Sequence, residues 1–138
     1  MIKGSSVIIN GDGETSRDFC YVKNAIQANI LAATALDSLI RNKSFDERIF
    51  RSPRNKIFNI AVGDRTTLKQ LYLYLSSILE TRLEKTKIKE PLYDDYRKGD
   101  IRDSLADISK AKTLLGYIPT HNIHNGLVET VDWYVKYN

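Results

Sequence analysis

The sequence predicts one domain with an α/β fold (mixed α+β), in which short strands and helices are interleaved. Short β-prone runs alternate along the chain with segments whose apolar residues recur at helical spacing. Turn residues separate these runs, and the sequence has no internal repeat or low-complexity tract. The 138 residues, 42% hydrophobic and 28% charged, suit one ordinary globular domain. Residues 1–138 are therefore expected to form a single unit.

Four stretches combine β-prone residues with flanking turn residues, which is typical of strands. They are residues 5–9, 18–22, 56–61 and a short part of 85–93. The first two flank the Gly-Asp-Gly sequence of residues 11–13. Because Asp-Gly favours tight turns, we expect these two strands to be joined as a hairpin.

Four other segments have an apolar face at helical spacing, and three of them begin at a residue that commonly caps helices. The expected helices are 24–39 capped by Asn24, 64–79 capped by Thr66 or Thr67, 107–115 capped by Asp107 and stopped by Gly116, and 125–137. Residues 41–55 break this regularity, with five basic residues and a Ser-Pro pair. We expect 41–55 to be a charged loop insertion.

The composition excludes several classes of function. A net charge of +4 favours anionic partners slightly, but the basic residues are scattered, so a nucleic-acid partner is not expected. No apolar run approaches the roughly 20 residues of a membrane helix, and no amino-terminal signal segment is visible. The single cysteine fits a reducing compartment. A cytoplasmic protein without a membrane partner is expected.

The sequence "NGDGETSRDFCYV", residues 10–22, contains two glycines of a dinucleotide-binding turn. That turn needs a third glycine and a helix that opens directly on it. The third position is Ser16, and the residues after it are β-prone. The sequence therefore indicates a turn between strands and argues against a dinucleotide site. His121 and His124 lack further ligands at metal-binding spacing, so no metal site is expected.

Two arginines lie in separate polar loops, Arg17 after the glycine turn and Arg97 beside Gly99. A guanidinium group presents a planar fork of donors that matches phosphate oxygens. The two side chains could bind one diphosphate, although the spacing alone does not show that they meet. The other interpretation is that both are solvated surface residues.

Four segments in order resemble the carboxy-terminal portion of extended short-chain dehydrogenase/reductase enzymes. They are "GDGETSRDFCYVKNAIQANILAA", "NIAVGDRTTLKQL", "YRKGDIRDSLADISKAKTLLGY" and "GLVETVDWY". The sequence is most similar to bacterial UDP-N-acetylglucosamine 4-epimerases of the NAD-dependent epimerase/dehydratase family, which act in surface polysaccharide synthesis. The resemblance covers nearly the whole chain except 41–55.

This resemblance implies a substrate site. Arg17 and Arg97 occupy the positions of the family's arginines that bind the UDP diphosphate, and Asp100 that of an aspartate that contacts the ribose or orders its loop. Ser104 matches the position that controls the size of the hexose pocket, where a small residue admits an N-acetyl group. The alternative for Ser104 is a serine that only bonds to nearby backbone.

The family's glycine-rich NAD turn and its catalytic Tyr-x-x-x-Lys pair have no match in the sequence. The resemblance therefore implies a part that lacks the amino-terminal Rossmann half and carries no catalytic or cofactor-binding residue. NAD is expected in the complete enzyme only. We expect this chain to be inactive alone and to need the NAD-binding half or to self-associate.

Two other functions remain open. One is a fragment of a nucleotide-sugar dehydratase or decarboxylase of the same superfamily, and the other is a non-catalytic UDP-sugar binding module.

Overall fold

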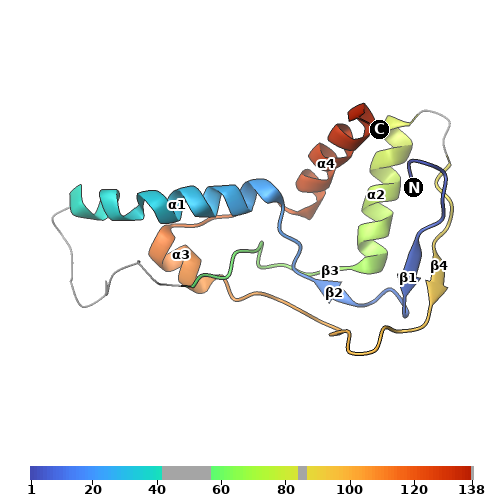
Figure 1. Ribbon diagram of the computed structural model, residues 1–138, viewed down its shortest axis with the longest axis horizontal. Helices are drawn as coiled ribbons and strands as arrows, with labels where there is room; N and C mark the ends of the chain where they lie inside the picture. Colours follow the sequence, from blue (N-terminus) through green and yellow to red (C-terminus); the bar gives the residue numbers. More distant parts are fainter. Residues whose placement is uncertain (42–56, 84–86, 138) are drawn as a thin grey trace.

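A computed structural model describes residues 1–41, 57–83 and 87–137, with the side chains of 35–41 left out. Its elements follow the order β1 (Ile8–Asn10), β2 (Ser16–Arg17), α1 (Val22–Arg41), β3 (Thr66–Thr67), α2 (Leu68–Arg82), β4 (Leu92–Asp94), α3 (Ser109–Leu115) and α4 (Ile123–Tyr137). This interleaving confirms the predicted mixed α/β class. Helices α1 and α3 lie side by side at one end, while α2 and α4 pack together at the other (Figure 1).

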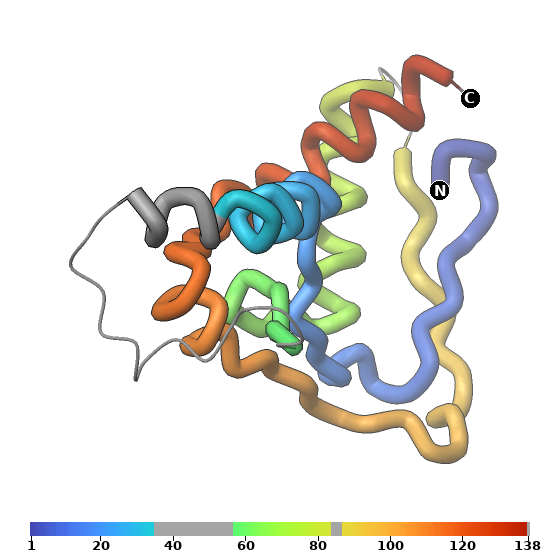
Figure 2. Tube along the Cα trace, turned by 60° about the vertical axis from the view of Figure 1, so that its left-hand side comes forward, coloured from blue at the N-terminus to red at the C-terminus, as the bar shows by residue number. Residues whose placement is uncertain are grey.

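Each end has its own apolar core, and extended segments join the two (Figure 2). One core lies between β1, α2 and α4 and is centred on Ile9, Leu79 and Val131. The other lies between α1 and α3, where Ala28 packs near Ala111, a residue with no exposed surface. The segments that join the cores carry both arginines singled out from the sequence.

The predicted hairpin between residues 5–9 and 18–22 is wrong. β1 pairs in parallel with β4, with Ile9 opposite Tyr93, and β2 pairs antiparallel with β3. The glycine turn does not fold the chain back, because its backbone groups bond to distant segments. The Gly11 amide donates to the Asp94 carbonyl at 2.8 Å, and the Gly13 carbonyl accepts from the Lys69 amide at 2.9 Å. Residues 18–21 form no strand and lead into α1.

The other two strand predictions succeed only in part. Residues 57–61 contain no strand, and Lys56 lies outside the described residues. Ile57 is 83% exposed, whereas Phe58 and Ile60 pack against the core beside α3 and Ala61 is buried there. Of 85–93 the structure describes 87–93, and among these only the last two residues belong to a strand, β4. Of the predicted insertion at 41–55, Arg41 ends α1 and the rest lies outside the described residues.

The helix predictions hold better. α2 begins with a capping box, in which Thr67 Oγ1 accepts from the Gln70 amide and the Gln70 side chain accepts from the Thr67 amide. Gly116 ends α3 in the left-handed conformation, as predicted. Asp107 does not occupy the cap position, although its Oδ1 accepts from the Ser109 amide at 2.9 Å. α4 begins two residues earlier than expected.

Asn24 is not the cap of α1, because the helix already begins at Val22. Its side chain is fully buried and joins α1 to the segment before α4. Asn24 Oδ1 accepts from the amides of Thr120 and His121 at 3.0 and 3.1 Å, and its Nδ2 donates to the His121 carbonyl at 2.7 Å. The amide therefore serves as a tertiary bridge. Gly126 also lets α4 lie close to the start of α1, since an added Cβ would lie 2.7 Å from Cβ of Tyr21, the residue before α1.

One face of α1 remains open. Val22, Ile26 and Ile30 follow each other at four-residue spacing and are 58%, 51% and 58% exposed. This spacing places them on one side of the helix, and we call them the α1 stripe. Isolated exposed apolar residues are common, whereas an aligned row of three is typical of a contact surface. Among the described residues, no helix is long and apolar enough to span a membrane.

The Asn24→Ala substitution is expected to lower the free energy of unfolding by about 2–3 kcal/mol, because it removes a fully buried side chain that accepts from the partly buried amides of residues 120 and 121. Chemical unfolding in urea measures this change. Asn29→Ala is the matched control, since the Asn29 side chain is exposed and donates only to the Ala25 carbonyl within α1. Equal stability of the two variants would contradict the bridging role of Asn24.

Candidate functional site

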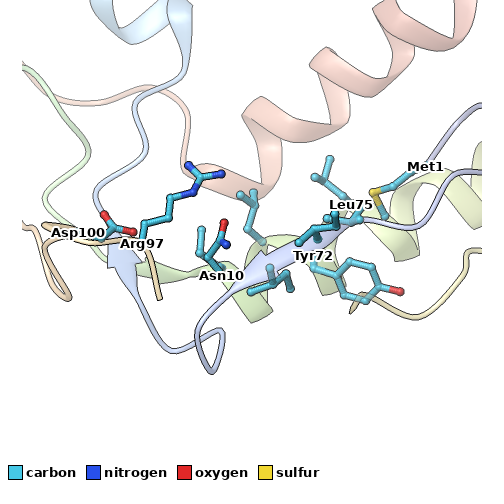
Figure 3. Close-up of a pocket in the computed structure, with 11 residues that line it drawn as sticks. Met1, Asn10, Tyr72, Leu75, Arg97 and Asp100 are labelled. Carbon is cyan, nitrogen blue, oxygen red and sulfur yellow. The ribbon is translucent and has the colours of Figure 1, made fainter. Parts of the chain in front are cut away.

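A cavity of about 290 Å³ lies between β1, α2 and the loop after β4. Its walls are mostly apolar and include Tyr72 and Leu75 of α2. Asn10, Arg97 and Asp100 form its polar end, with Met1 and Tyr72 towards the other end (Figure 3). Amphipathic cavities of this kind, with a few polar groups in an apolar wall, are the usual form of small-molecule sites.

Arg97, which the sequence analysis singled out, lines the polar end of this cavity. Its guanidinium has no hydrogen-bond or ion-pair partner among the described residues, and the residue is exposed. The loop turns directly after it, because the Asp100 amide donates to the Arg97 carbonyl at 3.1 Å and Gly99 has φ of 83°. This turn places Arg97 and Asp100 at the same end of the cavity.

Arg17 reaches the same loop from β2 but does not line the cavity. Its Nη2 donates to Asp100 Oδ1 at 2.6 Å, and its Nη1 donates to the carbonyls of Ser16 and Arg102 at 2.8 and 3.4 Å. The structure therefore brings Arg17, Asp100 and Arg97 together: Asp100 accepts from the Arg17 side chain and donates its amide to the Arg97 carbonyl. In this arrangement Asp100 is the partner of Arg17.

Ser104 lies beside this group and does not line the cavity. It is exposed, and its backbone amide donates to the Ser16 carbonyl at 3.2 Å. Ser16 also pairs with Asp103, whose Oδ1 accepts from Ser16 Oγ at 2.5 Å. Residues 102–104 thus run along β2 and fix the position of Ser104 relative to Arg17.

Asp18 is a site residue that the sequence reasoning missed. Its carboxylate accepts from the amides of Val62 and Gly63 at 3.0 Å each, and from the Ala106 amide at 3.4 Å. These bonds join the segment after β2 to the segments before β3 and α3. An acidic residue directly after Arg17 was the only signal, since backbone donors leave no trace in the sequence.

A second ion pair borders the same loop. Arg102 Nη2 donates to Asp12 Oδ2 at 2.7 Å, and Arg102 Nη1 donates to the Tyr96 hydroxyl at 3.1 Å. The hydrogen bond from Arg102, followed by that from the Glu14 amide, lowers the pKa of Asp12 to about 2. Asp12 therefore carries a negative charge at neutral pH.

The glycine turn does not fit an NAD pyrophosphate. The Gly11 amide and the Gly13 carbonyl are bonded to other parts of the chain, and the Tyr96 ring covers Gly11. A dinucleotide turn offers free amides at the start of a helix, whereas this turn leads to β2. This chain's own residues therefore supply no NAD site at the turn.

His121 takes part in a group of contacts around Glu129 of α4. His121 Nε2 lies 3.0 Å from Glu129 Oε1, and the Tyr21 hydroxyl donates to Glu129 Oε2 at 2.9 Å. Hydrogen bonds from Lys23 first, and then from Tyr21, lower the pKa of Glu129 to about 2. Within the described ranges, no group of three or more His, Cys, Asp or Glu side chains is arranged to hold a metal ion.

Residues 1–61 match the model of the NAD dependent epimerase/dehydratase family. A putative UDP-glucose 4-epimerase from Methanocaldococcus jannaschii is 29% identical over 133 residues, which are 96% of this chain and 35% of the relative. The chain spans about a third of the length of the curated relatives that it matches.

Solved structures show the same relationship. A UDP-glucose 4-epimerase from Thermotoga maritima, crystallised with UDP-glucose, is 38% identical with a TM-score of 0.74 and matches 99% of this chain and 37% of its own. A UDP-N-acetylglucosamine 4-epimerase from Methanobrevibacter ruminantium M1, in complex with UDP-N-acetylmuramic acid, is 34% identical with a TM-score of 0.73 and matches 98% and 36%.

More distant structures share the fold and hold the cofactor. A UDP-glucuronic acid 4-epimerase from Bacillus cereus, solved with UDP-glucuronic acid and NAD, is 24% identical with a TM-score of 0.69 and matches 99% of this chain and 37% of its own. Residues 1–61 of the chain therefore match the model of the NAD dependent epimerase/dehydratase family, and nearly the whole chain is similar to a part of UDP-sugar 4-epimerases.

Proposed function

We propose that this chain is the UDP-sugar-binding part of an NAD-dependent UDP-N-acetylhexosamine or UDP-hexose 4-epimerase in surface polysaccharide synthesis. The observation that carries the proposal is the position of Arg97 and Asp100 at the polar end of an otherwise apolar cavity. The similarity to epimerases that were crystallised with UDP-sugars supports it. We propose that the protein acts in the cytoplasm.

The diphosphate would be bound by Arg97 and Arg17. The guanidinium of Arg97 has no protein partner in the described part of the chain, so a phosphate can bind to it without displacing a side chain. Arg17 would exchange its contact with Asp100 for a contact with the phosphate. The Asp100 carboxylate would then be released to accept hydrogen bonds from ribose hydroxyls.

The size of the cavity limits what it can enclose. Its 290 Å³ lies just below the usual range of small-molecule sites, roughly 300–1,000 Å³. The cavity would therefore hold the nucleoside end, and the sugar would extend past the arginines towards Ser104. A serine at that place leaves space for an N-acetyl group, which favours UDP-N-acetylhexosamines.

Catalysis would need a second component. A 4-epimerase requires a base for the sugar hydroxyl and a bound NAD that accepts and returns a hydride. Neither the glycine turn nor any Tyr-x-x-x-Lys sequence supplies these on this chain. We propose that an NAD-binding polypeptide docks on the α1 stripe and that the chain alone is inactive. Self-association through the same stripe would compete with this docking.

Titration of the chain with UDP-N-acetylglucosamine, followed by amide NMR, is expected to shift the signals of Asn10, Arg97 and Asp100. Arg97→Ala is expected to weaken the affinity at least tenfold, because a charge-assisted hydrogen bond contributes about 1.5–3 kcal/mol. Arg82→Ala is the matched control, since Arg82 is exposed and pairs with Asp132 at the far end of α2. Dispersed amide signals, which indicate a folded chain, that do not shift on addition of the ligand would contradict the proposal.

Mixing the chain with the remaining part of the Thermotoga maritima epimerase is expected to restore epimerisation of UDP-N-acetylglucosamine when NAD is present. Ile26→Asp and Ile30→Asp are each expected to reduce the restored rate by weakening docking on the α1 stripe. Leu73→Asp, at an equally exposed position on α2, serves as the control. Binding of UDP without restored turnover would instead favour a non-catalytic UDP-sugar binding module.

A further inference from the structure

The loop that carries Arg97 and Asp100 contains no regular structure of its own between β4 and Arg102. Its first end is fixed because Asn10 Nδ2 donates to the Asp95 carbonyl at 3.1 Å. Its second end is fixed because the Ser16 amide donates to the Arg102 carbonyl at 2.8 Å. The residues between these ends include Arg97 and Asp100, which are two of the three residues proposed to bind the ligand.

Side chains connect the two ends of this loop to each other and to the glycine turn. Arg102 donates through one nitrogen to the Tyr96 hydroxyl and through the other to Asp12. Tyr96 and Arg102 directly flank the segment 97–101, so their contact closes it into a short ring. We call Asp12, Tyr96 and Arg102 the Arg102 cluster.

Gly11 provides the space for this arrangement. A Cβ on Gly11 would lie 2.3 Å from Tyr96 Cε1, and the residue has φ of 78°, which L side chains rarely adopt. The Tyr96 ring therefore lies directly on the backbone of the turn. The Gly-Asp-Gly sequence, which resembles part of a nucleotide loop, thus holds a neighbouring loop in place.

We propose that the Arg102 cluster positions Arg97 and Asp100 for UDP-sugar binding, so that Asp12, Tyr96 and Arg102 are positioning residues. The inference rests on the proposed function, because it assigns these residues a role in that same site. Binding is stronger when the loop is already ordered, since less conformational entropy is lost on association. A short ring closed by side chains restricts the loop in this way.

Loss of the Arg102 cluster should change the order of this loop and leave the global stability of the protein nearly unchanged. The side chains of Arg102 and Asp12 are 53% and 42% exposed, and ion pairs with this exposure contribute little to global stability. The Arg82–Asp132 pair between α2 and α4 has similar exposure and a 2.6 Å contact, but lies away from the loop. These two pairs allow the same chemical change to be compared at the loop and elsewhere.

The test measures UDP affinity of the full chain by calorimetry, together with hydrogen exchange of the Asp100 amide in the free protein. Asp12→Asn is expected to weaken UDP binding roughly three- to tenfold, as expected for the loss of one charged hydrogen bond. Exchange at Asp100 should accelerate. The control Asp132→Asn should leave both readings as in the wild type.

A charge reversal tests whether the ion pair between Asp12 and Arg102 itself is responsible for the change in affinity. Arg102→Asp alone should weaken binding further, because it places two like charges together. The double variant Asp12→Arg/Arg102→Asp restores the pair in reverse and should recover part of the affinity. A loss caused by the change at residue 102 alone, independent of its pair with Asp12, would not be recovered by the second charge reversal.

The outcomes separate the two proposals. If the wild type binds UDP and Asp12→Asn changes neither affinity nor exchange, the positioning role is overturned and the proposed function stands. If the wild type does not bind UDP, the proposed function fails and the inference fails with it. Weaker binding in Asp12→Asn, with recovery in the double variant, supports both.

Discussion

The carboxylate of Asp18 connects the parts of the molecule on which the site depends. It accepts backbone amides from Val62, Gly63 and Ala106, which belong to two segments distant in sequence from it and from each other. Hydrogen bonds to a charged acceptor are stronger than those between neutral groups. These bonds add to the contacts that Tyr21 and Lys23, around the start of α1, make with Glu129 of α4.

Arg17, directly before Asp18, bonds in another direction, to Asp100 and to the Arg102 carbonyl. Successive side chains of an extended segment point to opposite sides, so one short stretch contacts two different loops. Asp18 thereby holds together the segments before β3 and α3, and Arg17 holds the loop beside the cavity. The site is located where these two sets of contacts meet.

The arrangement fits the proposal of a binding part that keeps a defined site and needs a partner for catalysis. The cavity is formed by β1, α2 and the loop that carries Arg97, all within this chain. Ile26 and Ile30 of the α1 stripe line no wall of this cavity, whereas Val22 shares a neighbouring cavity with Leu71 and Leu75 of α2. Substrate binding and docking of an NAD-binding partner would therefore use different surfaces, joined through the Asp18 bonds.

The sequence by itself determined the mixed α/β class, the four helices of the described residues and the loop that carries Arg97, whereas Arg17, expected in a loop, lies in β2. Helical hydrogen bonds join residues four positions apart, so the apolar spacing of α2 and its Thr67–Gln70 capping box are local signals. The sequence also singled out Arg17, Arg97, Asp100 and Ser104, through polar loops and family resemblance. It missed Asp18 and took the glycine turn for a hairpin.

Only the tertiary structure decided the strand pairing and the geometry of the site. The strands have two or three residues each, and their partners lie far along the chain, so no local pattern specifies which pairs form. Arg17 and Asp100 are 83 positions apart, and Asn24 bridges to residues 96 and 97 positions away. Such contacts depend on which backbone groups are left without partners once the helices have packed, and this is set by the complete fold.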